Sequence, residues 1–382
     1  MIKDSILTSI CPNSSKIKVG DCYYIALPTK EWWPGVVLYR SQNGEEWEIH
    51  SYPLTRMSQL DLRGVANGGG VWSPSLSYDG DKCYLVFSNV RELGAIPQIE
   101  NYLVTSDDIA TGTWSAPVYL NSSFTSPYLM HDDDKKWLVC HDNHFRSKKS
   151  ECWIKQEYSV EEKQLVGEII ETKPQLNAEN EVLGKVISRD TYYDFRKLQN
   201  YDIELQTLRG PIYNAMTTCS QGLILRGQDS LCSRFDQTIV ARRTDCDSYT
   251  ISTKVEFDAE CEKHMAGLVI FFDTDNWYYM CITRNDETKK REIVEYSCEK
   301  GILSTVESNC TDENVPVALS ADVDKNELKF SFRANGKENV EFEKLTMVDI
   351  KDAPMVGICV QDMLSKQREA VFEYFNYGRK DN

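Results

Sequence analysis

"SYDGDKCYLVF" (residues 77–87) is the stretch that decides the fold. An Asp-Gly turn runs directly into aromatic and β-branched residues, which is typical of a tight hairpin entering a β-strand. The unit recurs as "VGDCYYI" (19–25) and "HDDDKKWLVCHD" (131–142), each time followed by further strand-like sequence. The three units lie about 50 to 60 residues apart, a period that indicates repeated four-stranded propeller blades.

The repeat ends near residue 175, and the polar segment 171–190 is predicted to be a linker. Later segments such as "DSYTISTKVEF" (247–257) alternate polar and apolar residues, as strands with one buried face do. We therefore predict an all-β chain with a partial, about three-bladed β-propeller at 5–183 and a β-sandwich of the concanavalin or jelly-roll type at 184–382. Three blades are fewer than the roughly four to eight of a closed propeller.

The composition limits the class of ligand. A net charge of −16 excludes the basic face that nucleic acids need and suits a neutral ligand such as a sugar. The 13 cysteines have no CxxC or Cys/His spacing, so we expect reduced thiols in a cytoplasmic protein, without a metal or cofactor. We find neither the apolar segment of a signal peptide nor a run of about 18 apolar residues, and expect no membrane association.

Several segments together resemble glycoside hydrolase family 43, in its β-xylosidase branch. In the first half they include "EWWPGVVLYRSQNGEEWE" (31–48), "SQLDLRGVANGGGVWSPSL" (58–76) and "YLVTSDDIATGTWSAPVYL" (102–120). In the second half "HMAGLVIFFDTDNWYYMCITRNDE" (264–287) and "FEYFNYG" (372–378) are similar to the β-sandwich of that branch. The resemblance covers nearly the whole chain and implies a propeller of the five-bladed family type with a central active site.

The resemblance also implies a chemistry. Members of the family release xylose or arabinofuranose from short chain ends with inversion. Inversion needs a carboxylate base on a water and a carboxylic acid on the leaving oxygen, roughly 6.5–9.5 Å apart. The family adds a third carboxylate that orients the acid and tunes its pKa.

The three carboxylate positions of the family are not occupied by carboxylates here. The base position falls on Asn13, whose amide cannot take a proton from water near neutral pH. The tuning position falls on Ser126, and the Thr-Glu-Gly-Pro motif of the general acid is absent. The resemblance therefore implies that about two blades of the family's propeller are missing. We therefore expect no intact catalytic residue and absent or feeble hydrolysis. Two other readings stay open, in which Asn13 is a turn residue and Ser126 a strand-end hydroxyl.

The resemblance places other residues near the sugar pocket. Trp72 matches an aromatic residue that lines it, and Gln59, Asp61 and Arg63 belong to a segment beside it. Trp72 fits a sugar platform and a core residue equally well. Arg63 fits either the binding of sugar hydroxyls or an ion pair with Asp61 or another acidic neighbour, and we favour the ion pair. The glycines at 68–70 permit close approach of a ligand.

Three further clusters have a ligand-binding and a structural interpretation, and we favour the structural one in each. The segment 131–134 is a cation site or a hairpin turn. His141 and His144 form a possible ligand cluster without zinc spacing. Asp273 and Asp275 bind calcium or form a β-turn between two strands.

Three functional hypotheses remain. The chain is an inactive fragment of a decayed gene, a non-catalytic carbohydrate-binding protein with a pocket around Trp72, or an enzyme that uses other carboxylates such as Asp61 or Asp142. The expected ligand is a xylo-oligosaccharide or an arabinose-containing sugar. The open sheet edges of a shortened propeller predict self-association.

Overall fold

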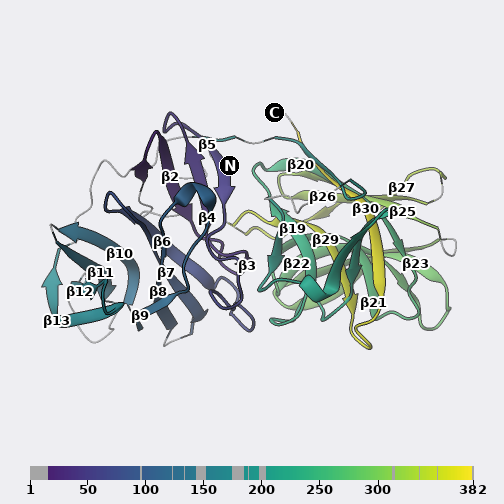
Figure 1. Cartoon of the computed structure of the whole chain (residues 1–382). Coiled ribbons are helices and arrows are strands. Elements are labelled where there is room, and N and C mark those ends of the chain that lie inside the picture. Colours follow the sequence, from purple (N-terminus) through teal and green to yellow (C-terminus); the bar gives the residue numbers. More distant parts are fainter. Residues whose placement is uncertain are drawn as a thin grey trace. The chain divides into compact units, whose positions relative to one another are not determined.

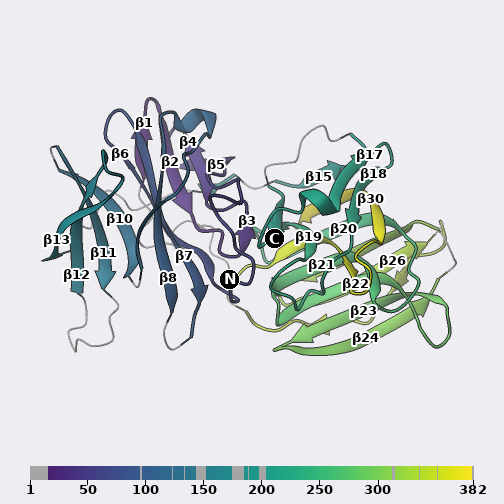
Figure 2. The same cartoon turned by 60° about the horizontal axis from the view of Figure 1, so that its bottom comes forward.

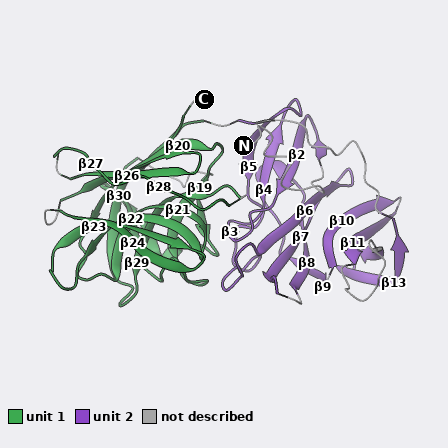
Figure 3. Cartoon of the chain, turned by 180° about the vertical axis from the view of Figure 1, so that it is seen from behind, with its two compact units in different colours: residues 1–2, 188–382 green, residues 3–187 purple. Residues whose placement is uncertain are grey.

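The computed structural model forms two compact units, residues 3–187 and residues 188–382 together with 1–2 (Figure 3). Within the described residues the regular elements are strands and two short 3₁₀ helices, η1 (Ile109–Thr111) and η3 (Tyr213–Ala215). None of these helices is long and apolar enough to cross a membrane. The structure describes residues 16–94, 97–122, 124–132, 134–142, 152–173, 185–187, 189–197, 204–311, 315–334, 336–350 and 352–380.

The first unit holds three sheets, each built mainly from four antiparallel strands (Figure 1). The first sheet has the order β1 (Ile17–Val19), β2 (Cys22–Leu27), β4 (Val37–Ser41), β5 (Glu46–Ser51) and β14 (Lys185–Val186). The second is β6 (Gly70–Tyr78), β7 (Cys83–Glu92), β8 (Gln98–Ser106) and β9 (Val118–Ser122). The third is β10 (Phe124–Asp132), β11 (Lys135–Asp142), β12 (Cys152–Ser159) and β13 (Gln164–Thr172). The short strand β3 (Trp32–Trp33) lies between β2 and β4 in the chain.

The second unit is a sandwich of two large sheets. One runs in the order β17 (Met216–Cys219), β18 (Gly222–Arg226), β30 (Glu369–Arg379), β20 (Ser248–Phe257), β25 (Val317–Asp324), β26 (Glu327–Ala334) and β27 (Val340–Glu341), with β15 (Thr191–Asp194) on β30 and β28 (Leu345–Thr346) on β26. The other runs β24 (Ile302–Cys310), β23 (Arg291–Glu299), β22 (Asn276–Arg284), β21 (His264–Asp273), β29 (Met355–Asp362), β19 (Thr238–Arg243) and β16 (Gln206–Leu208). Figure 2 shows β21 to β24 as neighbouring strands of one layer.

The middle sheet of the first unit is buried on both faces. On β7, Leu85 and Phe87 belong to a cluster shared with the first sheet, whereas Tyr84 and Val86 belong to a cluster shared with the third. Successive residues of a strand point to opposite faces, so one strand serves both clusters. The sheets therefore pack face to face in sequence, as propeller blades do.

The sandwich has one large core. Leu319 and Phe330 from one sheet join Leu268, Met280 and Ile358 from the other in a single buried cluster. Strands such as β25 alternate buried and exposed residues along most of their length. The predicted all-β class, with propeller-type sheets followed by a β-sandwich, is confirmed.

The Asp-Gly turn that opened the sequence argument forms as predicted. Asp79 Oδ1 accepts from the N–H groups of Asp81 and Lys82 at 3.1 and 2.8 Å, and Gly80 has φ +99°. A positive φ is easy for glycine and strained for other residues. The predicted domain boundary at 183/184 lies outside the described residues.

Candidate functional site

Two predicted site residues lie on the first strands of neighbouring sheets. Trp72 is on β6 and Ser126 is on β10, and each strand is an edge of its sheet. β10 packs against β6, and β6 also packs against β1 and β2. The first strands thus form one neighbourhood, which is where a propeller places its centre.

Both strands carry the same irregularity at this place. In β6 the ladder shifts between Trp72 and Ser75, and Ser73 has φ +45°. In β10 the ladder shifts between Thr125 and Tyr128, and Ser126 has φ +52°. Each of the two serines precedes a proline. Bulges re-aim side chains, and left-handed backbone at non-glycine residues clusters at functional sites, so the pair marks the candidate site.

Trp72 is half-buried, and its polar edge is used inside the protein. The indole Nε1–H donates to the Gly68 carbonyl at 2.8 Å. This bond orients the ring and leaves its partly exposed surface apolar. Such an indole ring can stack on the apolar face of a sugar, because neither the indole carbons nor the C–H groups of that face need a hydrogen-bond partner.

The glycines before Trp72 are explained by close backbone packing. Gly70 has φ +82°, and a Cβ there would lie 2.2 Å from the Lys30 carbonyl oxygen. Lys30 and Val71 exchange backbone hydrogen bonds of 3.2 and 2.9 Å. The close approach that we predicted for a ligand is thus made by the chain's own backbone.

Glu31 is a site residue that the sequence argument missed. It is 6% exposed, and its Oε1 accepts from the Gly68 N–H at 2.5 Å. It therefore supports the turn whose carbonyl holds Trp72. Its position in the sequence could have indicated this role. Glu31 directly precedes Trp32 and Trp33, which are both buried, so its carboxylate is drawn into the interior with them.

Gln59 is engaged within the protein. Its Oε1 accepts from the N–H groups of Thr55 and Arg56, each at 3.2 Å. Its Nε2 donates to the carbonyls of Trp114 and Ser115 at 3.3 and 2.8 Å. Gln59 joins two loops, and a sugar would have to displace these bonds. The predicted binding role of Gln59 stays a prediction.

Asp61 and Arg63 form the ion pair that the sequence analysis favoured. Arg63 Nη2 lies 2.7 Å and Nε 3.0 Å from the two oxygens of Asp61, and the Arg63 N–H donates to the same carboxylate. Arg91 Nη2 donates to the Asp61 carbonyl at 3.0 Å. The Arg63 hydrogen bonds hold the pKa of Asp61 below its ordinary value, which weakens this carboxylate as a general base.

Of the residues considered for catalysis, the structure describes Ser126 and Asp142 but not Asn13. Asn13 lies outside the described residues. Ser126 is half-buried on the β10 bulge and offers a hydroxyl, which neither carries charge nor tunes an acid as a carboxylate does. Asp142 is half-buried at the end of β11. The described part of this neighbourhood offers a half-buried aromatic ring and a half-buried hydroxyl.

The other sequence clusters are structural where they are described. His131 and Asp132 lie at the end of β10, where Asp132 pairs with Lys135 in a hairpin, and His141 packs edge-on against Trp153. Asp273 Oδ1 accepts from the Asp275 N–H at 2.7 Å, as in a β-turn. Asp133 and His144 lie outside the described residues. Across the described ranges no group of three or more His, Cys, Asp or Glu side chains could hold a metal ion.

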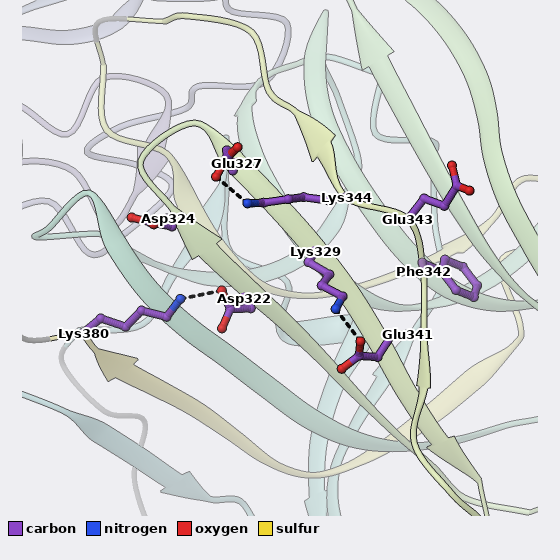
Figure 4. Close-up of a pocket in the computed structure, with 9 residues that line it drawn as sticks. All are labelled: Asp322, Asp324, Glu327, Lys329, Glu341, Phe342, Glu343, Lys344 and Lys380. Carbon is purple, nitrogen blue, oxygen red and sulfur yellow. Dashed lines mark hydrogen bonds and ion pairs between the residues drawn. The ribbon is translucent and has the colours of Figure 1, made fainter.

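A separate hollow lies on the sandwich (Figure 4). Its lysines are paired with carboxylates: Lys329 with Glu341, Lys344 with Glu327, and Lys380 with Asp322. Exposed pairs of this kind contribute little and neutralise one another. A neutral sugar would find no aromatic platform there except Phe342, whose ring is buried in the core.

Two family models match the chain. The model described as "Glycosyl hydrolases family 43" matches residues 2–191, and the "Beta xylosidase C-terminal Concanavalin A-like domain" matches residues 193–378. Together they account for both units.

Individual relatives agree with these models. A "Beta-xylosidase" of Bacillus subtilis (strain 168) is 25% identical over 534 aligned positions, which cover 99% of this chain and 100% of that protein. A "Xylosidase/arabinosidase 43B" of Humicola insolens is 41% identical over 170 residues, 44% of this chain but only 31% of that protein. The solved xylan beta-1,4-xylosidase from Bacillus halodurans C-125 has a TM-score of 0.87 at 26% identity, covering 99% of this chain and 100% of that one.

Proposed function

The chain belongs to glycosyl hydrolases family 43, and we propose that it binds xylose- or arabinose-containing sugars at Trp72 with little or no hydrolysis. The relatives are named as xylosidases and arabinosidases, which supports this sugar class. The observation that carries the proposal is the pair of bulged first strands, one carrying Trp72 and the other carrying Ser126. The resemblance aligns Ser126 with a carboxylate of the family.

The binding part of the proposal rests on Trp72. Its ring is oriented by the bond to Gly68, and Gly68 is in turn held by Glu31. A pre-oriented ring loses little conformational entropy on binding, which favours affinity for a sugar face.

The loss of hydrolysis rests on the missing acid–base groups. Each proton-transfer role contributes roughly 10²–10⁴-fold to the rate. Asn13 and Ser126 supply neither a base nor a tuning carboxylate. Asp61 is a poor substitute base, because Arg63 holds its pKa low.

The length of the alignment supports a shortened propeller. The Bacillus subtilis relative aligns over 534 positions, whereas this chain has 382 residues. The relative therefore contains residues without a counterpart here. We propose that they include the blade that carries the family's general acid.

The test measures binding and turnover separately. Calorimetry with xylobiose and arabinose should detect binding to the wild type that is lost in Trp72→Ala. Tyr119→Ala is the matched control, because Tyr119 is an exposed aromatic residue on β9 of the same sheet. Equal binding by all three proteins, or none by the wild type, would remove Trp72 as the platform.

Turnover is assayed on p-nitrophenyl β-xyloside and α-arabinofuranoside, whose leaving group needs little acid assistance. We expect no turnover by the wild type and slow turnover by Asn13→Asp, because the variant restores a base. Rapid turnover by the wild type would contradict the loss of hydrolysis and direct attention to other carboxylates, such as Asp142.

A further inference from the structure

β23 places a glutamate inside the apolar sandwich. Glu295 is paired with Met280 of β22, on the strand face that also carries Ile293, and both neighbours belong to the core. Glu295 is 1% exposed, and neither carboxylate oxygen has a hydrogen-bond partner in the described part of the chain. An ionised carboxylate buried without a partner is strongly destabilising. The folded state therefore favours the protonated acid.

The residue opposite Glu295 on its other side is also a glutamate. β24 pairs Glu307 with Glu295 in the antiparallel ladder, so their Cβ atoms lie about 5 Å apart. Glu307 Oε2 accepts from the Glu343 backbone N–H at 2.8 Å. This bond uses Glu307 as an acceptor, and a protonated Glu295 at the paired position carries a donor.

We propose that Glu295 and Glu307 form a proton-sharing carboxyl pair that makes the stability of the sandwich depend on pH. The proposal concerns the sandwich alone and does not depend on sugar binding. Glu295 is buried, whereas Glu307 is half-buried on the otherwise exposed strand β24. Two carboxylates that face each other repel strongly when both are ionised and one of them is desolvated, which favours retention of one proton by the pair.

The other charged and titratable groups around the pair have partners of their own. Arg291, on the same face of β23, donates to the carbonyls of Phe257 and Val315. On β22 the Tyr278 hydroxyl donates to Glu299 at 2.7 Å. Glu343, in the connection between β27 and β28, donates its backbone N–H to Glu307.

The direction of the pH dependence follows from the raised pKa of Glu295. Burial, and then the charge of Glu307, raise the pKa of Glu295 from an ordinary value of 4.5 to about 7. Between these values the folded chain keeps a proton that the unfolded chain has lost. The contribution to stability is therefore complete below about pH 4.5 and declines until about pH 7, above which it stays low.

The experiment compares urea unfolding of the full chain at about pH 5 and about pH 8.5. The wild type is measured beside Glu295→Gln, an amide that imitates the neutral acid, and Glu292→Gln, a matched change on the outer face of β23. Ile293→Val, a core change in the same strand, identifies the transition of the sandwich. The unfolding constant of the wild type, relative to Glu295→Gln, should rise about a hundredfold between the two pH values.

Two outcomes would overturn the proposal. One is a pH profile of Glu295→Gln that runs parallel to the wild type, and the other is an equal effect in Glu292→Gln. Glu307→Gln tests the pairing independently of whether Glu295→Gln folds. It should reduce the pH-dependent loss without abolishing it, because burial of Glu295 remains, and an unchanged loss would show that Glu307 takes no part.

Discussion

The two units of the chain bury their apolar residues in different ways. In the sandwich one cluster joins two large sheets, and residues such as Leu319 and Phe330 are fully enclosed. In the first unit separate, smaller clusters lie between successive sheets, and their members range from fully enclosed residues such as Leu85 to Leu129, which is 5% exposed. The bulges beside Trp72 and at Ser126 also belong to the first unit.

This difference suggests that the sandwich contributes mainly to stability and the three-sheet unit mainly to ligand binding. A regular two-sheet core maximises enclosed apolar area, but it leaves little room for an irregular backbone. Stacked small sheets bring several edge strands together, and bulges on those strands can present side chains to a ligand. We therefore expect the sandwich to be the more stable unit, and the three-sheet unit carries the candidate site.

The largest expected effect comes from matched core truncations in the two units. Leu319→Ala in the sandwich should lower the free energy of unfolding by about 4–5 kcal/mol, because a fully enclosed site cannot collapse around the cavity. Leu129→Ala should cost about 2–3 kcal/mol, because its smaller cluster can relax. Chemical denaturation measures both. Equal losses in the two variants would contradict the expected difference between the large core of the sandwich and the smaller cores of the first unit.

A second prediction tests the glycine turn that supports Trp72. Gly70→Ala should destabilise the first unit by about 2–3 kcal/mol, because its φ is left-handed and its Cβ would meet the Lys30 carbonyl. Gly94→Ala is the control, since no atom lies within 4 Å of a Cβ there. Urea unfolding should show a change of less than about 0.5 kcal/mol for the control. Similar losses in both variants would mean that the close approach is unimportant.

The smallest expected effect concerns the strain at the second bulge. Ser126→Gly should stabilise the first unit by about 1 kcal/mol, because glycine adopts the observed φ of +52° without strain. Ser75, on β6, has no positive φ, so Ser75→Gly should instead destabilise by roughly 0.5–1 kcal/mol. Thermal unfolding of the two variants should shift in opposite directions. A loss of stability in Ser126→Gly would show that the serine makes a contact worth more than the strain.

The fold was more predictable than the site. The all-β class and the two kinds of sheet architecture followed from turn residues and alternation, which are local signals. The ion pair of Asp61 with Arg63 was favoured because two residues of opposite charge lay two positions apart. Gln59 illustrates the limit, because its partners at Trp114 and Ser115 are more than 50 residues away in the chain.

Sequence by itself determined where strands begin and which residues share a face. The Asp79–Gly80 turn and the alternation along β20 depend only on neighbouring residues, and they form as the sequence predicts. Only the tertiary structure decided which faces meet. The left-handed backbone at Ser126, the bond from Trp72 to Gly68 and the pairing of Glu295 with Glu307 all depend on it. Register and bulges arise from packing between distant segments, so no local pattern encodes them.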